Sequence, residues 1–212
     1  MLTIQPYPMP TAADLAPGPA GWRLDPRRAA LLIHDMQGYF VGFLPSGASP
    51  TTELLANIAA LRAAGLPVIY SAQPGRMSRA DRGLLHDVWG PGMTDDPANR
   101  DIVDALAPGP DDLVLTKWRY SAFHRTRLAG LLAETGRDQL IVCGVYAHLG
   151  CLLTACDAYA HDIQPFLVAD AVAAFSAADH RLALDYAARA CAVTLTTAQA
   201  LDALRDDCSL RV

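Results

Sequence analysis

One carboxylate, one amide, one ammonium and one phenol follow four apolar segments of the 212-residue sequence. Asp35 follows LLIH, Gln73 follows PVIYSA, Lys117 follows LVLT, and Tyr146 follows QLIVCGV. A carboxylic acid near a cation can transfer protons, and amide and phenol groups can orient a polar substrate. Taken singly these residues are not diagnostic, because an Asp after a strand is often a helix N-cap. Their joint occurrence favours a catalytic site.

Six short apolar runs would position these side chains. They are typical of strands covered on both faces, and they span Ala29–His34, Pro67–Ser71, Leu113–Thr116, Gln139–Val145, Phe166–Ala169 and Ala192–Thr196. Apolar residues at helical spacing predict helices between them, at Thr52–Ala64, Ser121–Glu134 and Ala177–Ala190. Strands that alternate with helices predict an α/β fold with a parallel sheet and right-handed crossovers. Ligands bind outside the carboxyl ends of such strands, where the four polar residues stand.

The chain shows no internal repeat and no shift of composition that would mark a second domain. We therefore expect one domain over residues 1–212, with a proline-rich lead-in over residues 1–28. The stretch Ala72–Asp112 contains no clear strand, and stretches of this length in compact domains are often binding loops or lids. It carries Arg82 and Trp89 in addition to Gln73.

Composition limits the classes of partner. Hydrophobic residues make up 52% of the chain and charged residues 18%, which argues against disorder. The net charge is −5 and no basic face is evident, so we expect neither nucleic acid nor a membrane as partner. The N-terminal sequence has no signal-peptide pattern, and no apolar run reaches the ~18 residues of a membrane span. These features predict a cytoplasmic protein.

Cysteine and histidine spacing gives no sign of a metal centre. The five cysteines are Cys143, Cys151, Cys156, Cys191 and Cys208, and no C-x-x-C pair occurs among them. Neither a zinc site nor a disulfide framework is expected. His86, His124, His161 and His180 show no metal-ligand spacing with one another, and we find no D-x-H zinc pattern, so we predict no metal and no cofactor.

Three segments carry a resemblance to a known family. LLIHDMQGYF, TKWRYSAF and GVYAHLGCLL resemble the isochorismatase-like (cysteine hydrolase) superfamily, and the resemblance covers nearly the whole chain. It implies a single three-layer domain with a six-stranded parallel sheet and helices on both faces. It also implies a homodimer, for which the alanine-rich faces at Ala155–Ala160 and Ala183–Ala190 are candidate contacts, although alanine-rich faces also pack inside proteins. Longer runs such as SAQPGRMSRADRGLLHDVWGPGM look closest to the phenazine-pathway branch, which hydrolyses 2-amino-2-deoxyisochorismate.

The resemblance implies a catalytic pair and raises a question about a thiol. The family's Asp and Lys fall on Asp35 and Lys117. The nucleophilic Cys of amidase members falls on Gly150, and Cys151 stands one residue further on. One residue along a helix is ~100° of rotation, so we expect the Cys151 thiol to point away from Asp35.

Substrate contacts are likewise implied by the resemblance. A chorismate-derived substrate carries two carboxylates, for which the planar donors of an Arg are suited. The implied binding residues are Gln73, Arg82, Lys117, Tyr146 and the backbone of Gly150, with Trp89 as a wall of the ring pocket and Phe40 as either a pocket or a core residue. We also expect a cis peptide bond at Val145–Tyr146.

These residues suit hydrolysis of an enolpyruvyl vinyl ether. A proton must reach the methylene carbon, after which water adds to the oxocarbenium ion and pyruvate leaves; no covalent intermediate with the enzyme is needed. We expect burial to keep Asp35 protonated as the acid, although a nearby Lys117 ammonium would lower its pKa unless a substrate carboxylate offsets it. His34 precedes Asp35 in the strand, so we expect its side chain on the opposite face, hydrogen-bonded in the core.

Four functions are compatible with these features. The first is hydrolysis of 2-amino-2-deoxyisochorismate to trans-2,3-dihydro-3-hydroxyanthranilate and pyruvate, in phenazine-like antibiotic biosynthesis. The second is hydrolysis of isochorismate to 2,3-dihydro-2,3-dihydroxybenzoate and pyruvate. The third is a C–N amidase that uses Cys151. The fourth is a non-catalytic carrier or scaffold, against which we note that no carrier-type serine motif follows the last predicted helix.

Overall fold

The computed structural model describes residues 3–18 and 20–209, with the side chains of the last helix as far as residue 205. Its centre is a six-stranded sheet whose neighbouring strands are all parallel. The strands are β1 (Ala29–His34), β2 (Val68–Ala72), β3 (Leu113–Thr116), β4 (Gln139–Val145), β5 (Gln164–Ala173) and β6 (Val193–Leu195). All six predicted strands are present. The order is β3-β2-β1-β4-β5-β6, so the direction of winding reverses between β1 and β4, and ligands of such sheets bind at this point.

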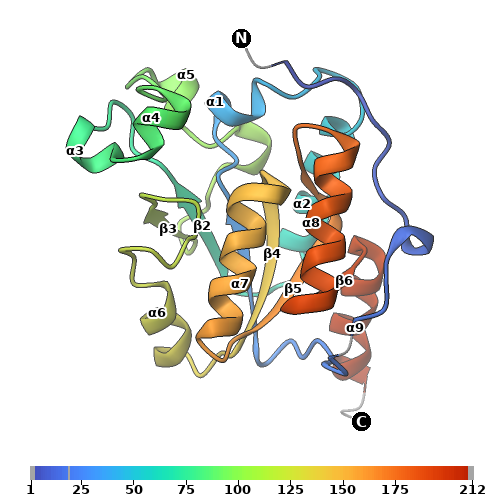
Figure 1. Ribbon diagram of the computed structural model, residues 1–212. Coiled ribbons are helices and arrows are strands. Elements are labelled where there is room, and N and C mark those ends of the chain that lie inside the picture. Colours follow the sequence, from blue (N-terminus) through green and yellow to red (C-terminus); the bar gives the residue numbers. More distant parts are fainter. Residues whose placement is uncertain (1–2, 19, 210–212) are drawn as a thin grey trace.

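Helices and turns connect the strands (Figure 1). The α-helices are α1 (Gly38–Val41), α2 (Thr51–Arg62), α3 (Arg79–Arg82), α4 (Leu85–Trp89), α5 (Pro97–Arg100), α6 (Leu128–Glu134), α7 (Leu152–Ala160), α8 (Ala177–Ala190) and α9 (Thr197–Ser209). Two 3₁₀ turns, η1 (Ala12–Asp14) and η2 (Asp104–Leu106), and one π-helical turn, η3 (Ala147–Cys151), complete the elements.

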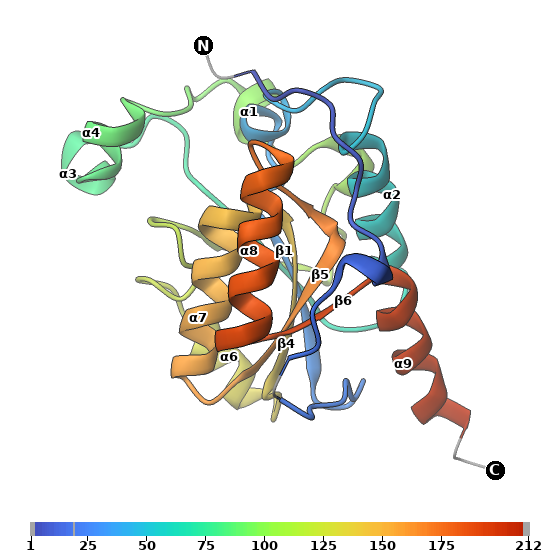
Figure 2. The same ribbon diagram turned by 45° about the vertical axis from the view of Figure 1, so that its right-hand side comes forward.

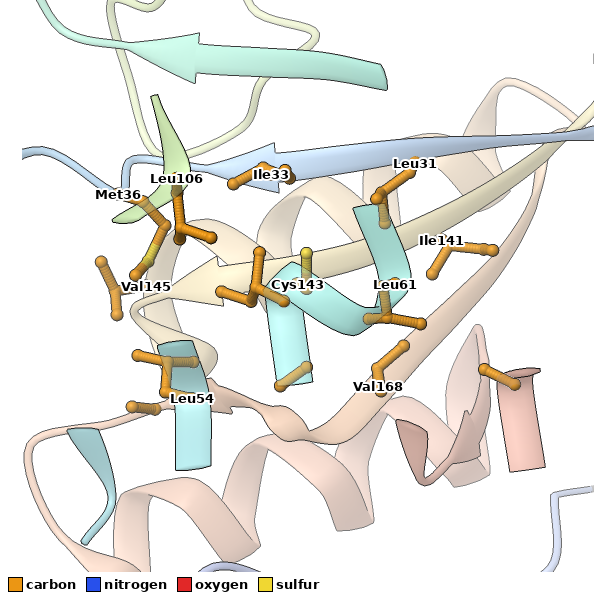
Figure 3. Close-up of a cluster of buried hydrophobic side chains, with 14 of the residues drawn as sticks. Leu31, Ile33, Met36, Leu54, Leu61, Leu106, Ile141, Cys143, Val145 and Val168 are labelled. Carbon is orange, nitrogen blue, oxygen red and sulfur yellow. The ribbon is translucent and has the colours of Figure 1, made fainter. Parts of the chain in front are cut away.

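The helices form two layers with the sheet between them (Figure 2). Residues of β1 alternate in direction, as a strand requires: Leu31 and Ile33 pack toward α2 and α9, while Leu32 packs toward α6, α7 and α8. Figure 3 shows part of the first cluster, where Leu54 and other α2 residues meet Leu31 and Ile33. Both faces of β1 and β4 are buried, which explains their continuous apolar sequences. The predicted three-layer α/β domain is confirmed.

The alanine-rich faces proposed for a subunit interface pack inside the protein instead. Ala155 and Ala158 of α7 and Ala183 and Ala187 of α8 are fully buried in the cluster beneath these helices. Small side chains let α7 and α8 lie close to the sheet, which accounts for the alanines without a partner subunit.

The predicted helix over Ser121–Glu134 was too long, because α6 begins only at Leu128. Local and tertiary hydrogen bonds compete with the helix in the preceding segment. The Thr126 hydroxyl donates to the Ala122 carbonyl at 2.6 Å, and the Ala122 N–H donates to the Thr154 hydroxyl at 3.0 Å. Arg125 has a φ of 56°, which no α-helix allows.

The segment between β2 and β3 contains no strand, as predicted, and all of it is described. It includes α3, α4, α5 and η2, and α3 and α4 lie away from the sheet (Figures 1 and 2). Within the described residues, no helix has both the length and the apolar character that crossing a membrane demands.

The described part of the N-terminal lead-in packs along the domain. Ile4, Tyr7 and Leu24 are buried in the cluster that also contains Leu54 and other α2 residues. The Tyr7 hydroxyl accepts a hydrogen bond from the Ala174 N–H at 2.7 Å. The described part of the lead-in therefore packs against the domain rather than standing free of it.

Candidate active site

A pocket of about 330 Å³ lies at the carboxyl ends of β1 and β4. All eight predicted site residues line it: Asp35, Phe40, Gln73, Arg82, Trp89, Lys117, Tyr146 and Gly150. They follow the ends of β1, β2, β3 and β4 or belong to α1, η3 and the α3–α4 segment, so the sheet and the long segment build the pocket together. The Val145–Tyr146 peptide bond is cis, as predicted.

Asp35 and Lys117 form a buried ion pair at the bottom of the pocket. The Lys117 Nζ lies 2.8 Å from Asp35 Oδ2, and Lys117 is 1% exposed. Lys117 Nζ also donates to the Arg119 carbonyl at 2.6 Å. Asp35 Oδ1 accepts a hydrogen bond from the Ser71 hydroxyl at 2.7 Å, so the carboxylate is held from both sides.

The environment of Asp35 holds its pKa below the usual range of an aspartate. Burial favours the neutral acid and would raise the pKa, but the Lys117 ammonium, His34 and the hydrogen bond from Ser71 together outweigh burial. The expectation that burial alone keeps Asp35 protonated was therefore wrong for the pocket without substrate. In that state Asp35 is a carboxylate.

Arg82 is a buried cation without a carboxylate partner among the described residues. Its guanidinium Nε donates to the Gly90 carbonyl at 2.6 Å, and burial followed by the charge of Arg119 lowers its pKa. Gly92 makes room for it, because a Cβ at that position would lie 2.8 Å from Arg82 Nη2. A guanidinium placed in this way is available to an anion that enters the pocket.

Aromatic rings form the apolar side of the pocket. The Tyr146 ring contacts Phe40 at 6.1 Å and Phe175 at 4.7 Å between centroids, both edge to face. The Tyr146 hydroxyl donates to the Phe40 carbonyl at 2.6 Å, so in this structure it has no second proton to donate to a bound molecule. Trp89 lies at the rim, 40% exposed, with its ring 5.8 Å from Phe175. This wall suits a flat, partly unsaturated ring.

The thiol of Cys151 is not part of the pocket. Gly150 lies in the pocket wall, whereas Cys151 is fully buried in the cluster between the sheet and α7. Burial, together with the charges of Cys143 and Asp35, raises the pKa of the Cys151 thiol well above its usual value. A nucleophilic cysteine needs an accessible thiolate, so Cys151 does not meet the requirement of an amidase.

His34 does not point away from Asp35 as predicted. Its ring lines the same pocket, with Nδ1 3.8 Å from Asp35 Oδ1. The alternation of strand side chains ends at Asp35, whose φ of 50° turns its side chain to the side of His34. The ring is buried and hydrogen-bonded, as expected, and burial lowers the pKa of His34 to about 4.

Sequence reasoning overlooked three residues that support the site. Ser71 anchors the Asp35 carboxylate, and Phe175 stands between the rings of Tyr146 and Trp89. The buried Gln37 accepts from the Gln73 N–H at 2.8 Å and donates to the Gln73 carbonyl at 2.8 Å. The position of Ser71 at a strand end was a usable signal, whereas the roles of Gln37 and Phe175 depend on tertiary contacts.

The described residues contain no group of three or more His, Cys, Asp or Glu side chains able to hold a metal ion. What they do supply is a carboxyl group that can carry a proton, two cations for anionic groups and an apolar wall. This set can protonate a bound substrate and stabilise charge that develops on it.

Similarity to known proteins extends over nearly the whole chain. Residues 29–199 match the isochorismatase domain. The chain is 55% identical over 203 residues to the phenazine biosynthesis protein PhzD1 of Pseudomonas aeruginosa, which covers 94% of this chain and 97% of that protein. It is 55% identical over 207 residues to an isochorismatase of Bacillus subtilis, covering 96% of this chain but 66% of that protein.

A solved structure agrees with these matches. A cysteine hydrolase from Pseudomonas syringae pv. phaseolicola superimposes with a TM-score of 0.78 at 29% identity, over 87% of this chain and 96% of that one. The family match and the relatives at 55% identity lead to one conclusion: the chain belongs to the isochorismatase family of hydrolases.

Proposed function

We propose that the protein cleaves the vinyl ether of 2-amino-2-deoxyisochorismate, giving trans-2,3-dihydro-3-hydroxyanthranilate and pyruvate. The observation that carries this proposal is the buried Asp35–Lys117 pair, 2.8 Å apart, in a pocket where Gly150 stands at the nucleophile position. An acid without a nearby nucleophile suits a reaction that begins with proton transfer to carbon.

The reaction follows from this arrangement. Asp35 in its acid form protonates the enolpyruvyl methylene carbon, and the electron pair of the C=C bond forms the new C–H bond. Water adds to the resulting oxocarbenium ion and gives up a proton, which can return to Asp35. The hemiketal then collapses: the bond between the hemiketal carbon and the ether oxygen breaks, the hemiketal hydroxyl becomes the carbonyl of pyruvate, and its proton passes to the ether oxygen, which leaves as the ring alcohol. The net change is the addition of one water molecule.

The substrate itself would make Asp35 an acid. In the free pocket Lys117 keeps the pKa of Asp35 low. A substrate carboxylate that pairs with Lys117 brings negative charge next to Asp35, and a like charge favours the protonated form. Lys117 thus orients the substrate and couples its binding to proton uptake by Asp35. This step keeps the acid role of Asp35 compatible with a carboxylate in the free protein.

Arg82 is our candidate for the second substrate carboxylate. It is buried, lines the pocket and has no carboxylate partner among the described residues. Gln73 is held by Gln37 and lies 3.3 Å from Asp35 Oδ2, where its amide can contact the enolpyruvyl group. We assign Trp89, Phe40 and Tyr146 to the ring of the substrate.

The relatives support two substrates to different degrees. The phenazine biosynthesis protein PhzD1 is matched over 97% of its length, which favours the amino compound. The isochorismatase of Bacillus subtilis is equally identical, at 55%, and favours isochorismate as the alternative, with 2,3-dihydro-2,3-dihydroxybenzoate as product. The two substrates differ by one amino or hydroxyl group, so both fit the same acid mechanism.

Pyruvate release from both compounds, side by side and with EDTA present, tests the proposal. We expect pyruvate from both and the higher kcat/KM with 2-amino-2-deoxyisochorismate. A preference for isochorismate would keep the mechanism and change the substrate. No pyruvate from either compound, from protein whose circular dichroism shows it folded, would overturn the proposal.

We also propose a cytoplasmic homodimer. The outer surfaces of α7 and α8 expose large apolar side chains, among them Tyr159, Leu182 and Tyr186, at 50% or more. Such a patch is typical of a subunit contact. Cys156 and Cys191 are free thiols 3.7 Å apart, which suits a reducing compartment. Light scattering on the purified protein tests the dimer, and the variant Leu182→Lys should then yield monomers; cell fractionation tests the compartment.

A further inference from the structure

The side chain of His34 occupies the volume next to Gly150 in which a nucleophilic side chain at position 150 would stand. A Cβ built on Gly150 would lie 2.8 Å from His34 Nε2 and 3.0 Å from Nδ1, and it would overlap Cε1 of the same ring. Atoms of real side chains do not approach this closely without displacement. The imidazole of His34 and any side chain at position 150 therefore compete for one volume.

The His34 ring is fixed in this volume from two sides. Its Nδ1 lies 2.9 Å from the Val145 carbonyl at the end of β4, and its Nε2 lies 3.2 Å from the Tyr120 carbonyl in the loop after β3. The ring is fully buried. A larger residue at position 150 would have to displace the ring from these contacts.

The backbone of Asp35 brings the Asp35 carboxylate to the side on which the His34 ring lies. With a φ of 50° at Asp35, the last strand residue and the catalytic carboxylate both reach the pocket. Position 34 ends β1 and lies beside position 150 of η3, the turn that follows the neighbouring strand β4; in the register of the two strands His34 stands directly opposite Gly144.

We propose that His34 determines which chemistry this pocket can perform: its imidazole occupies the volume that a nucleophilic side chain at position 150 needs, and its single N–H, on Nδ1, holds the Val145 carbonyl next to Tyr146. The pair His34 and Gly150 then acts as one unit. A ring at 34 requires glycine at 150, and a small residue at 34 admits a side chain at 150. His34 is in this sense a positioning residue, and only its activity readout depends on the proposed function.

A variant set tests the exchange of volume. The proteins are Gly150→Cys, His34→Ala and the double variant, with Gly150→Ala and His34→Asn as a milder set. Asn retains a donor near the Val145 carbonyl but lacks the atoms Cε1 and Nε2 that a Cβ at position 150 would meet. We expect each Gly150 variant alone to unfold at lower urea concentration than the wild type. We expect each double variant to be more stable than the sum of its single variants predicts.

The introduced thiol provides a readout that does not depend on substrate. Iodoacetamide labelling followed by peptide mapping compares it with Cys151 in the same protein. In His34→Ala/Gly150→Cys we expect the introduced thiol to react at least about tenfold faster than the buried Cys151. In addition, His34→Asn should keep more of the wild-type kcat than His34→Ala, because it still supports the Val145 carbonyl.

Additive effects of the two positions on stability would overturn the proposal, as would a Gly150→Cys protein as stable and as active as the wild type. If the single Gly150 variants fail to fold, folding of the double variants supports the proposal and their failure refutes it. A wild type that releases no pyruvate would refute the proposed function alone, since the coupling and the labelling decide the role of His34 separately.

Discussion

The indole N–H of Trp89 donates a hydrogen bond to the hydroxyl of Tyr120 at 2.6 Å. This bond connects α4, at the end of the segment that lies away from the sheet, to the loop that follows Lys117. Both residues line the pocket. The contact therefore joins the two sides of the pocket entrance and fixes the Trp89 ring at its rim.

Tyr120→Phe should weaken substrate binding more than it slows the chemical step. It removes one hydrogen bond, which contributes about 1 kcal/mol, so KM should rise about fivefold while kcat stays close to the wild-type value. Tyr186→Phe is the matched control, because Tyr186 is half exposed on α8. Steady-state pyruvate release measures both constants. A fall of kcat with unchanged KM would contradict this role of the contact.

Asp35→Asn should abolish most of the activity. The amide has nearly the same shape but cannot deliver a proton, and loss of a general acid lowers kcat about 100- to 10,000-fold. It also leaves the buried Lys117 ammonium without its counter-charge, so the free energy of unfolding should fall by about 3 kcal/mol.

A stability measurement separates these two effects. Kinetic assays at a temperature at which circular dichroism shows the variant folded report the catalytic loss alone. The exposed Asp104→Asn serves as control and should change neither quantity. A folded Asp35→Asn protein that keeps most of its kcat would remove Asp35 from the mechanism.

Most of the fold could be predicted from the sequence because the strand signals are local. The runs Ala29–His34 and Gln139–Val145 are continuous and apolar since both of their faces are buried, and their observed bounds agree with the prediction. The start of α6 could not be predicted, because the bond between Ala122 and Thr154 joins segments 32 residues apart. Periodicity does not report such contacts.

The site was predicted in composition but not in electrostatics. A shared strand edge was enough to place Asp35 and Lys117 together. It did not give their separation of 2.8 Å, on which the low pKa of Asp35 depends. Nor did alternation along β1 predict that Asp35 and His34 lie on the same side, because the positive φ at Asp35 ends the alternation there.

Cys151→Ala should leave catalysis unchanged. The thiol is buried beneath α7 and does not line the pocket, so kcat/KM should stay within about twofold of the wild type. The small cavity should reduce the free energy of unfolding by about 1 kcal/mol. A folded Cys151→Ala protein without activity would return the amidase hypothesis to consideration, and an amide-substrate screen would then follow.

Gly92→Ala should weaken binding through Arg82. Gly92 has a φ of 80°, and an added Cβ would lie 2.5 Å from Arg82 Nη1, so the guanidinium must move. Loss of one charge-assisted contact corresponds to about a tenfold rise in KM. Gly65→Ala is the matched control, because Gly65 has a φ of 78° and open space around its Cβ position. Both variants place an alanine at nearly the same positive φ, so the backbone strain is matched. Equal KM values in the two variants would show that Arg82 does not contribute to substrate binding.

Stability should decrease with acid before the aspartates titrate, because two histidines are buried in neutral form. Burial lowers the pKa of His34 from 6.5 to about 4, and that of His180 likewise to about 4. Between about pH 6.5 and about pH 4, His34 and His180 are protonated in the unfolded chain but stay neutral in the native protein. The free energy of unfolding should therefore fall as the pH drops below about 6.5, by up to about 1.4 kcal/mol per pH unit for each histidine, and this loss should cease near pH 4.

Urea titrations between about pH 7.5 and about pH 4.5 measure this slope. His180→Gln should be less stable than the wild type at every pH, since the ring nitrogens of His180 lie 2.9 Å from the Ala169 carbonyl and 3.2 Å from the Tyr7 hydroxyl. Its slope should nevertheless be shallower, because one of the histidines whose pKa burial lowers is gone. The exposed His124→Gln should retain the wild-type slope. Equal slopes in all three proteins would show that His180 is not held neutral by burial, whatever the loss of stability at neutral pH.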